Sequence, residues 1–172
     1  MTGPAVRVYS GERLEWIIER PFEEVMRSLH GVLRPTSRPR MMLMIALKRK
    51  AALELYLQRL AGDLGLMILG SVQHGQVLGL LGGPKRAAMF LIGNPLVALG
   101  MMQVHAEAGV YAPLRVMFTE SEPGRTRMTY DRPSRLFGQW PEAVFNSTGS
   151  MLDEKLERLV RLLRGRDKEA KG

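Results

Sequence analysis

The sequence contains no cysteine among its 172 residues. This absence excludes disulfide bonds, thiolate catalysis, iron–sulfur clusters and any zinc site with sulfur ligands. No uncharged apolar run approaches the roughly 18 residues that suggest a membrane-spanning helix. The first 20 residues also lack an apolar stretch followed by a small-residue cleavage site. We therefore expect a cytoplasmic protein with no transmembrane span.

Sequence motifs of the common catalytic folds are missing as well. There is no Gly-x-Ser-x-Gly turn for a serine nucleophile and no Gly-x-Gly-x-x-Gly dinucleotide fingerprint. The glycine-rich segment 79–86 fails the P-loop spacing, and Pro84 removes a backbone donor that a phosphate cradle needs. His30, His74 and His105 show neither the i, i+4 pairing nor the clustering of metal motifs. The sequence identifies no cofactor and no metal site.

What the chain does contain is an ordinary globular composition. Hydrophobic residues make up 45% and charged residues 24%. A chain of this length favours one domain and buries roughly 70% of the surface that its unfolded form exposes. We therefore treat residues 1–172 as a single domain, with a frayed tail at 165–172.

Positive charge is concentrated in segments. The net charge is +8, yet residues 25–53 hold seven Lys or Arg and no acid. Such a face attracts nucleic acid, anionic lipid or an acidic protein partner, or it simply keeps the surface solvated. Six of these residues fall within 34–50, which we single out as a basic interaction segment: Arg34, Arg38, Arg40, Lys48, Arg49 and Lys50.

The same segment holds seven consecutive apolar residues, Met41 to Leu47. Their helix propensity is high, so we expect an extra helical segment near residues 41–62. Residues 34–50 are expected to be a basic, methionine-rich insertion in the domain. An apolar run beside basic residues suits a partner groove or a membrane surface. A core helix or a dimer-contact helix with a solvated basic end is the alternative.

Hydrophobic periodicity and turn residues predict an α+β fold with an antiparallel or mixed sheet and helices packed on one face. The expected strands are 13–18, 67–72, 77–81, 88–92, 114–119 and 125–130, the last two joined by the Glu122-Pro123-Gly124 turn. The expected helices begin near Pro21, near residue 51, at Leu96 and at Ser150, where Ser150 and Asp153 approximate a capping box.

Several motifs in the second half of the chain resemble one known family. They are Phe90-Leu91-Ile92-Gly93-Asn94-Pro95, Met101-Met102-Gln103, Ala112-Pro113-Leu114-Arg115-Val116, Tyr130-Asp131-Arg132-Pro133 and, upstream, Val72-Gln73-His74. Together they are similar to the Domain of Unknown Function 302 family over roughly residues 64–138. The resemblance implies a β-α-β fold of TATA-box-binding-protein-like topology and a homodimer. It implies no established activity.

Two departures from the family pattern affect the inferred site. Arg132 stands between Asp131 and Pro133, and Gln73 replaces the family's acid before His74. The resemblance nevertheless implies a shared cleft lined by a few polar ligand-binding residues. They are His74, Asn94, Gln103, Tyr130 and Asp131.

Three functions are compatible with these observations. The first is a non-catalytic homodimeric module that binds a small or apolar ligand, favoured by the uncharged middle of the chain. The second is an interaction protein that uses segment 34–50 against an acidic partner, anionic lipid or nucleic acid. The third is an enzyme in which His74 and Asp131 form an acid–base pair.

Overall fold

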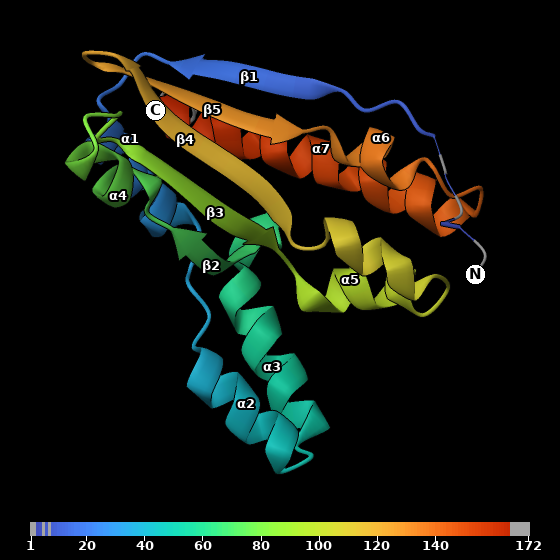
Figure 1. The fold of residues 1–172 in the computed structure, drawn as a ribbon. Helices are drawn as coiled ribbons and strands as arrows, with labels where there is room; N and C mark the ends of the chain where they lie inside the picture. Colours follow the sequence, from blue (N-terminus) through green and yellow to red (C-terminus); the bar gives the residue numbers. More distant parts are fainter. Residues whose placement is uncertain (1–2, 5, 7, 166–172) are drawn as a thin grey trace, which may run out of the picture.

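The structure, a computed structural model, describes residues 3–4, 6 and 8–165. Its centre is a five-stranded sheet in the order β1-β5-β4-β3-β2, in which every neighbouring pair is antiparallel (Figure 1). The strands are β1 (Arg13–Ile18), β2 (Met67–Val72), β3 (Ala87–Gly93), β4 (Leu114–Glu122) and β5 (Arg125–Asp131). The α+β class is thus confirmed, and the sheet is antiparallel.

Seven α-helices and two short 3-10 segments are described around this sheet. They are α1 (Phe22–Val32), α2 (Arg38–Ala46), α3 (Lys50–Ala61), α4 (His74–Leu80), α5 (Pro95–Met102), α6 (Pro133–Phe137), α7 (Ala143–Arg164), η1 (Gly62–Leu64) and η2 (Ala106–Tyr111). No helix within the described residues is both long enough and apolar enough to cross a bilayer. The expected helical segment near residues 41–62 is present as α2 and α3.

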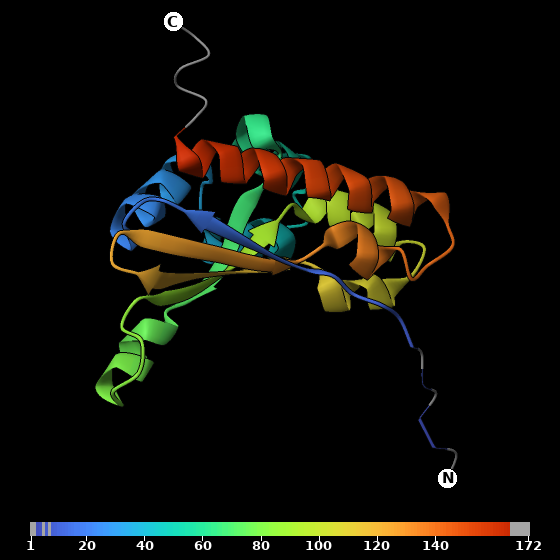
Figure 2. The ribbon, with the colours of Figure 1, turned by 90° about the horizontal axis from the view of Figure 1, so that it is seen from above.

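One face of the sheet holds the core. Because side chains alternate along a strand, Phe90, Val116 and Tyr130 lie in one row across three strands and point to the same side. Helices α1 and α7 cover that side (Figure 2). Helix α7 presents a buried stripe that includes Leu152 and Leu156, so the apolar side of this amphipathic helix contributes many of the core side chains.

The opposite, open face of the sheet carries mixed side chains. Along β5 and β1 it is charged and held by ion pairs such as Arg13 to Asp131. Across the middle of β3 and β4 it is apolar, with half-buried Met89 and Met117 facing each other across the strands, and Arg115 follows on the same face of β4. Helix α4 projects on this side of the sheet, away from α1 and α7 (Figure 2).

Helices α2 and α3 form a hairpin that projects from the body of the protein, hereafter the arm (residues 38–61; Figure 1). Its entry is fixed to the edge of the sheet, because the backbone N–H of Thr36 donates to Ile68 O and that of Ile68 donates to Arg34 O. The Tyr56 hydroxyl accepts a hydrogen bond from the Ser37 backbone N–H at 2.8 Å. These bonds orient the arm relative to β2.

The expected strand at residues 77–81 is wrong, since this segment belongs mostly to α4 and the turn after it. The run of valine, leucine and glycine has no distinct period, and short apolar runs do not distinguish strand from helix. The helix packs tightly on the start of β3. A Cβ at Gly75 would collide with the backbone of Lys85 to Ala87.

The predicted start of the last helix at Ser150 is also wrong. Helix α7 begins two turns earlier, at Ala143, and Ser150 lies inside it. The Asp153 carboxylate instead accepts a hydrogen bond from the Ser134 backbone N–H at 3.1 Å, bracing α6 against α7. A Cβ at Gly149 would approach Ser134 Cα to 2.7 Å, so glycine permits this close contact.

The helix expected to begin at Leu96 is present as α5, which begins one residue earlier, at Pro95. Helix α5 ends at Met102, and Met101 is its only buried residue. The chain then continues into η2, whose Tyr111 ring packs edge-on against Phe137 and Trp140. The predicted frayed tail at 165–172 lies, apart from Gly165, outside the described residues.

Candidate functional site

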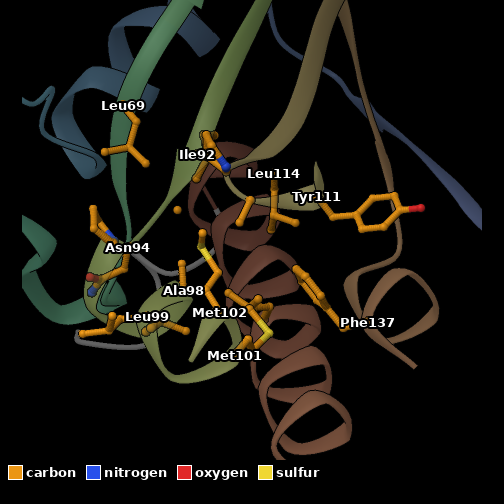
Figure 3. Close-up of a pocket in the computed structure, with 16 residues that line it drawn as sticks. Leu69, Ile92, Asn94, Ala98, Leu99, Met101, Met102, Tyr111, Leu114 and Phe137 are labelled. Atoms are coloured by element: carbon orange, nitrogen blue, oxygen red, sulfur yellow. The ribbon is translucent and has the colours of Figure 1, made fainter. Parts of the chain in front are cut away.

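An apolar cavity of about 290 Å³ lies where β3 ends and β4 begins. Helices α5, α6 and α7 enclose it together with η2 (Figure 3). Its walls come from segments more than 80 residues apart in the sequence. The lining residues are Leu69, Ile92, Gly93, Asn94, Pro95, Val97, Ala98, Leu99, Met101, Met102, Tyr111, Ala112, Pro113, Leu114, Phe137 and Leu152.

The cavity has a buried floor and an accessible rim. Ile92, Met101 and Phe137 are essentially buried and belong to the main core. Leu99 and Met102 are 51% and 40% exposed, so these two side chains of α5 border the opening to solvent. Because methionine is flexible and polarisable, Met102 can adapt to ligands of different shape.

Local sequence explains how α5 is placed over the strand ends. Asn94 occupies the N-cap, and its side-chain oxygen accepts a hydrogen bond from the Leu96 backbone N–H at 3.0 Å. Pro95 follows at the first helical position, where its fixed φ favours the helix and no backbone donor is needed. The Asn94 amide nitrogen donates to Gly65 O at 3.1 Å, tying α5 to the start of β2.

No polar side-chain group in the described lining is directed into the cavity and free to bind a ligand. Both ends of the Asn94 amide are hydrogen-bonded to the protein backbone. The Tyr111 hydroxyl points away from the cavity (Figure 3). The Tyr111 side chain instead contacts Tyr9, and the two rings meet edge-on. A hydrogen bond to Tyr111 raises the pKa of Tyr9 above its usual value of 10.0. The cavity wall is therefore almost entirely hydrocarbon and thioether.

The five residues expected to share a cleft are not brought together. Asn94 alone lines the cavity. Gln103 is exposed at the C-cap of α5, and His74 begins α4 after the edge strand β2. Asp131 receives the Arg13 guanidinium on the open face at 2.9 Å.

Tyr130 lies in the core rather than in a cleft. It is 2% exposed, and its hydroxyl accepts a hydrogen bond from Trp16 Nε1 at 3.1 Å. Burial raises the pKa of Tyr130 above its usual value of 10.0. This environment keeps the phenol protonated and gives it a packing role.

The geometry does not support His74 and Asp131 as an acid–base pair. Asp131 ends β5, His74 begins α4 just after β2, and strands β3 and β4 lie between β5 and β2. Three strand spacings of about 4.8 Å separate the two positions by roughly 14 Å or more. Groups that exchange a proton with one reacting atom must reach within about 3 Å of it.

A metal site is not formed within the described residues, where no three histidine or acidic side chains cluster. His105 and Glu107 are close in sequence, but His105 Nε2 contacts Glu142 Oε1 at 2.9 Å instead. The His105 ring also stacks on Trp140. These contacts fasten η2 to the start of α7.

A polar cleft of about 300 Å³ lies between α1 and α4. Its Arg86 is already paired with Glu120 at 2.7 Å and with Glu23 at 3.5 Å. The His30 ring packs edge-on against Phe90. Arg86 and His30 are thus both engaged by other side chains of the protein.

The cavity was not predicted from sequence as a set of residues. Its only sequence signal was the near absence of charge between residues 66 and 108, which contributes most of its wall. Phe137 and Leu152 come from later helices whose pattern indicates core packing, not a cavity. The sequence does not show that the side chains of these helices leave a cavity between them and the sheet.

Comparison with known proteins identifies the family but no activity. The family model described as "Domain of unknown function DUF302" matches residues 50–163. A search of the curated proteins gave no match. Among solved structures, the chain is similar to an uncharacterized conserved DUF302 protein from Bacillus stearothermophilus, with a TM-score of 0.60 and 13% sequence identity. That similarity covers 88% of this chain and 97% of the other, and it concerns the fold alone.

Proposed function

The chain belongs to the DUF302 family, and from that starting point we propose that it is a non-catalytic module that binds a small apolar ligand in the α5 cavity. The observation that carries this proposal is the chemistry of the cavity wall. An open cavity of about 290 Å³ lies near the lower end of the range found for small-molecule sites.

The wall chemistry restricts the class of ligand. A charged or strongly polar group inside the cavity would lose its hydration and find no free hydrogen-bond partner in the lining. A neutral aromatic or aliphatic group would exchange water for contacts with leucine, methionine and phenylalanine side chains. We therefore propose a ligand whose apolar part enters the cavity while any polar group stays at the rim formed by Leu99 and Met102.

The same wall argues against catalysis at this site. General acid–base chemistry needs a titratable group within hydrogen-bond reach of the substrate. The only titratable side chain in the lining is Tyr111, and its hydroxyl points away from the space (Figure 3). The proposal therefore assigns recognition, not turnover, to the cavity.

The proposal includes a homodimer, as the family resemblance implies. Leu80 and Leu81, at the end of α4 and in the turn after it, are 88% and 80% exposed. Exposed apolar clusters of this kind commonly mark protein–protein contacts. We place the dimer contact at these two leucines. Light scattering should show the Leu80→Ser/Leu81→Ser variant shifted toward monomer, whereas an unchanged dimer would move the contact elsewhere.

Titration with the neutral dye N-phenyl-1-naphthylamine tests the cavity. We expect dye fluorescence to rise on binding to the wild-type protein and the Ala98→Phe variant to bind at least tenfold more weakly, because the phenyl ring occupies the cavity. Ala143→Phe introduces the same ring at an exposed position of α7 and should bind normally. Equal dye affinity in all three proteins would refute the assignment.

Native mass spectrometry identifies a natural ligand. The protein as purified is compared with its denatured mass, and a non-covalent adduct lost on denaturation gives the ligand mass. The adduct should be absent from Ala98→Phe and present in Ala143→Phe. An adduct retained by Ala98→Phe would place the ligand outside the cavity.

A further inference from the structure

The arm exposes far more apolar surface than its packing requires. Met41 packs against the cluster of Leu57 and Ala61 on α3, and Met44 is the buried residue of α2. The other apolar side chains of α2 face solvent. The exposed side chains are Met42 (49%), Leu43 (59%), Ile45 (51%) and Leu47 (53%). Leu43 and Leu47 stand four residues apart and Met42 and Ile45 three apart, so these exposed side chains cover two sides of α2 and the turn after it. Together these four residues are called the apolar tip.

Basic side chains surround this apolar tip. Arg38 and Arg40 stand at the start of α2, and Lys48, Arg49 and Lys50 form the turn into α3. The nearest acid along the arm is Glu54, which lies 3.9 Å from Lys50. Among the described residues, Arg38, Lys48 and Arg49 have no carboxylate within 4.0 Å. The tip is therefore both apolar and strongly positive.

We propose that the arm docks on an anionic lipid surface. Its aliphatic side chains enter the boundary between headgroups and acyl chains, while the flanking lysine and arginine side chains face lipid phosphates. Interfacial helices combine these two features, an apolar side and a basic side, without spanning the bilayer. Long basic side chains can keep their charge at the headgroups while their stems contact the apolar layer.

Nucleic acid fits the arm less well. Proteins that bind single strands combine basic groups with aromatic rings that stack on bases. Tyr56 is the only aromatic residue of the arm, and its hydroxyl accepts the Ser37 N–H. The Arg40 guanidinium lies 4.8 Å from the centre of the Tyr56 ring and covers that face. Four exposed aliphatic side chains have no function on a phosphate backbone, whereas lipid gives them an apolar environment.

The base of the arm adjoins the cavity. Leu57 and Ala61 of α3 pack with Met67 of β2, and this cluster continues to Leu69 and Leu96. Leu69 also lines the cavity. A docked arm would therefore hold the cavity near the lipid surface. The docking proposal rests on the arm alone, so it can fail or succeed independently of the ligand proposal.

Vesicle co-sedimentation tests the docking. The full-length protein is mixed with vesicles of phosphatidylcholine alone or of phosphatidylcholine with phosphatidylglycerol. We expect binding to the anionic vesicles only, weakened by added salt. Lys48→Ala/Arg49→Ala should bind about 30-fold more weakly, given the contribution of each basic residue near an anionic surface.

A second variant tests the apolar contact. Leu43→Ser/Ile45→Ser should bind vesicles about tenfold more weakly or worse, because two half-exposed side chains lose their burial in lipid. Val110→Ser and Arg161→Glu alter exposed residues elsewhere and should bind as the wild type does. Circular dichroism checks that each variant is folded.

Three results would overturn the proposal. One is a wild-type protein that fails to sediment with anionic vesicles. Another is full binding by Leu43→Ser/Ile45→Ser, which would reduce the contact to charge alone. The third is loss of binding to a labelled single-stranded oligonucleotide in Lys48→Ala/Arg49→Ala without any change in vesicle binding, which would assign the arm to nucleic acid.

Discussion

Replacing Asn94 separates a structural role from a ligand-binding role. The side chain makes two hydrogen bonds, one accepted from Leu96 N–H as the cap of α5 and one donated to Gly65 O. Both of its polar atoms are thus used by the backbone, although the residue borders the cavity. Asn94→Ala should therefore destabilise the protein and leave apolar ligand binding nearly unchanged.

The expected loss follows from these two bonds. Removing an N-cap side chain costs about 1 kcal/mol of unfolding free energy. Removing the second bond, which leaves Gly65 O without this donor, costs about 1 kcal/mol more. The sum of about 2 kcal/mol corresponds to a fall in Tm of roughly 4–8 °C for a chain of this size.

Asn94→Asp divides the effect between the two bonds. The carboxylate keeps the cap and gains from the positive end of α5, but it cannot donate to Gly65 O. We expect a loss of about 1 kcal/mol, half that of the alanine variant. Gln103→Ala, at the exposed C-cap of the same helix, serves as the control and should stay within about 0.5 kcal/mol of the wild type.

Urea unfolding measures the stability of each variant, and dye titration under native conditions measures the cavity. If Asn94→Ala kept its unfolding free energy but bound N-phenyl-1-naphthylamine more than tenfold more weakly, the side chain would be a ligand contact. That result would refute the structural role inferred from its hydrogen bonds.

Three further predictions concern packing, charge and pH. Gly149→Ala should lose about 1–3 kcal/mol of stability in urea, because a Cβ there meets the backbone of α6, whereas Gly100→Ala, in open space on α5, should gain up to about 1 kcal/mol. A double-mutant cycle on the exposed pair Arg13 and Asp131 should give a weak coupling that falls with added salt; a coupling that salt does not change would contradict this view of the pair. Because burial raises the pKa of Tyr130, the folded state holds that proton more tightly than the unfolded state does. Stability should therefore fall as pH rises above 10.0, and it should fall less steeply in Tyr130→Phe; equal slopes in alkaline unfolding experiments would exclude this linkage.

The fold was more accessible from sequence than the site. The hairpin of β4 and β5 was predictable because two short segments rich in strand-forming residues flank Glu122-Pro123-Gly124, which is a strong turn signal. Segment 77–81 was misassigned as a strand because a leucine–glycine run suits either state until tertiary packing selects one. Helices and strands were thus predicted correctly where hydrophobic residues recur with a clear helical or strand period, or where a turn motif separates two strands.

The cavity depends on tertiary packing, which the sequence pattern does not encode directly. Its walls combine Leu69, Phe137 and Leu152, and their side chains meet only after the sheet and α7 have assembled. The sequence motifs predicted a cleft lined by polar residues. In the structure Tyr130 is buried in the core, and the Asn94 side chain is hydrogen-bonded to the backbone. An apolar site has no polar signature that motif analysis could detect.

The position of β1 in the sheet has a consequence for synthesis. Strand β1 is made first, yet its sheet partner is β5, and Arg13 pairs with Asp131 across 118 residues. At roughly 5–20 residues per second, the ribosome delivers that partner about 6–24 s later. During this interval Trp16 and Ile18 have no strand to pair with, while the strands from β2 to β5 can form neighbour by neighbour. The docking of β1 onto β5 is therefore expected to be the last step of sheet assembly.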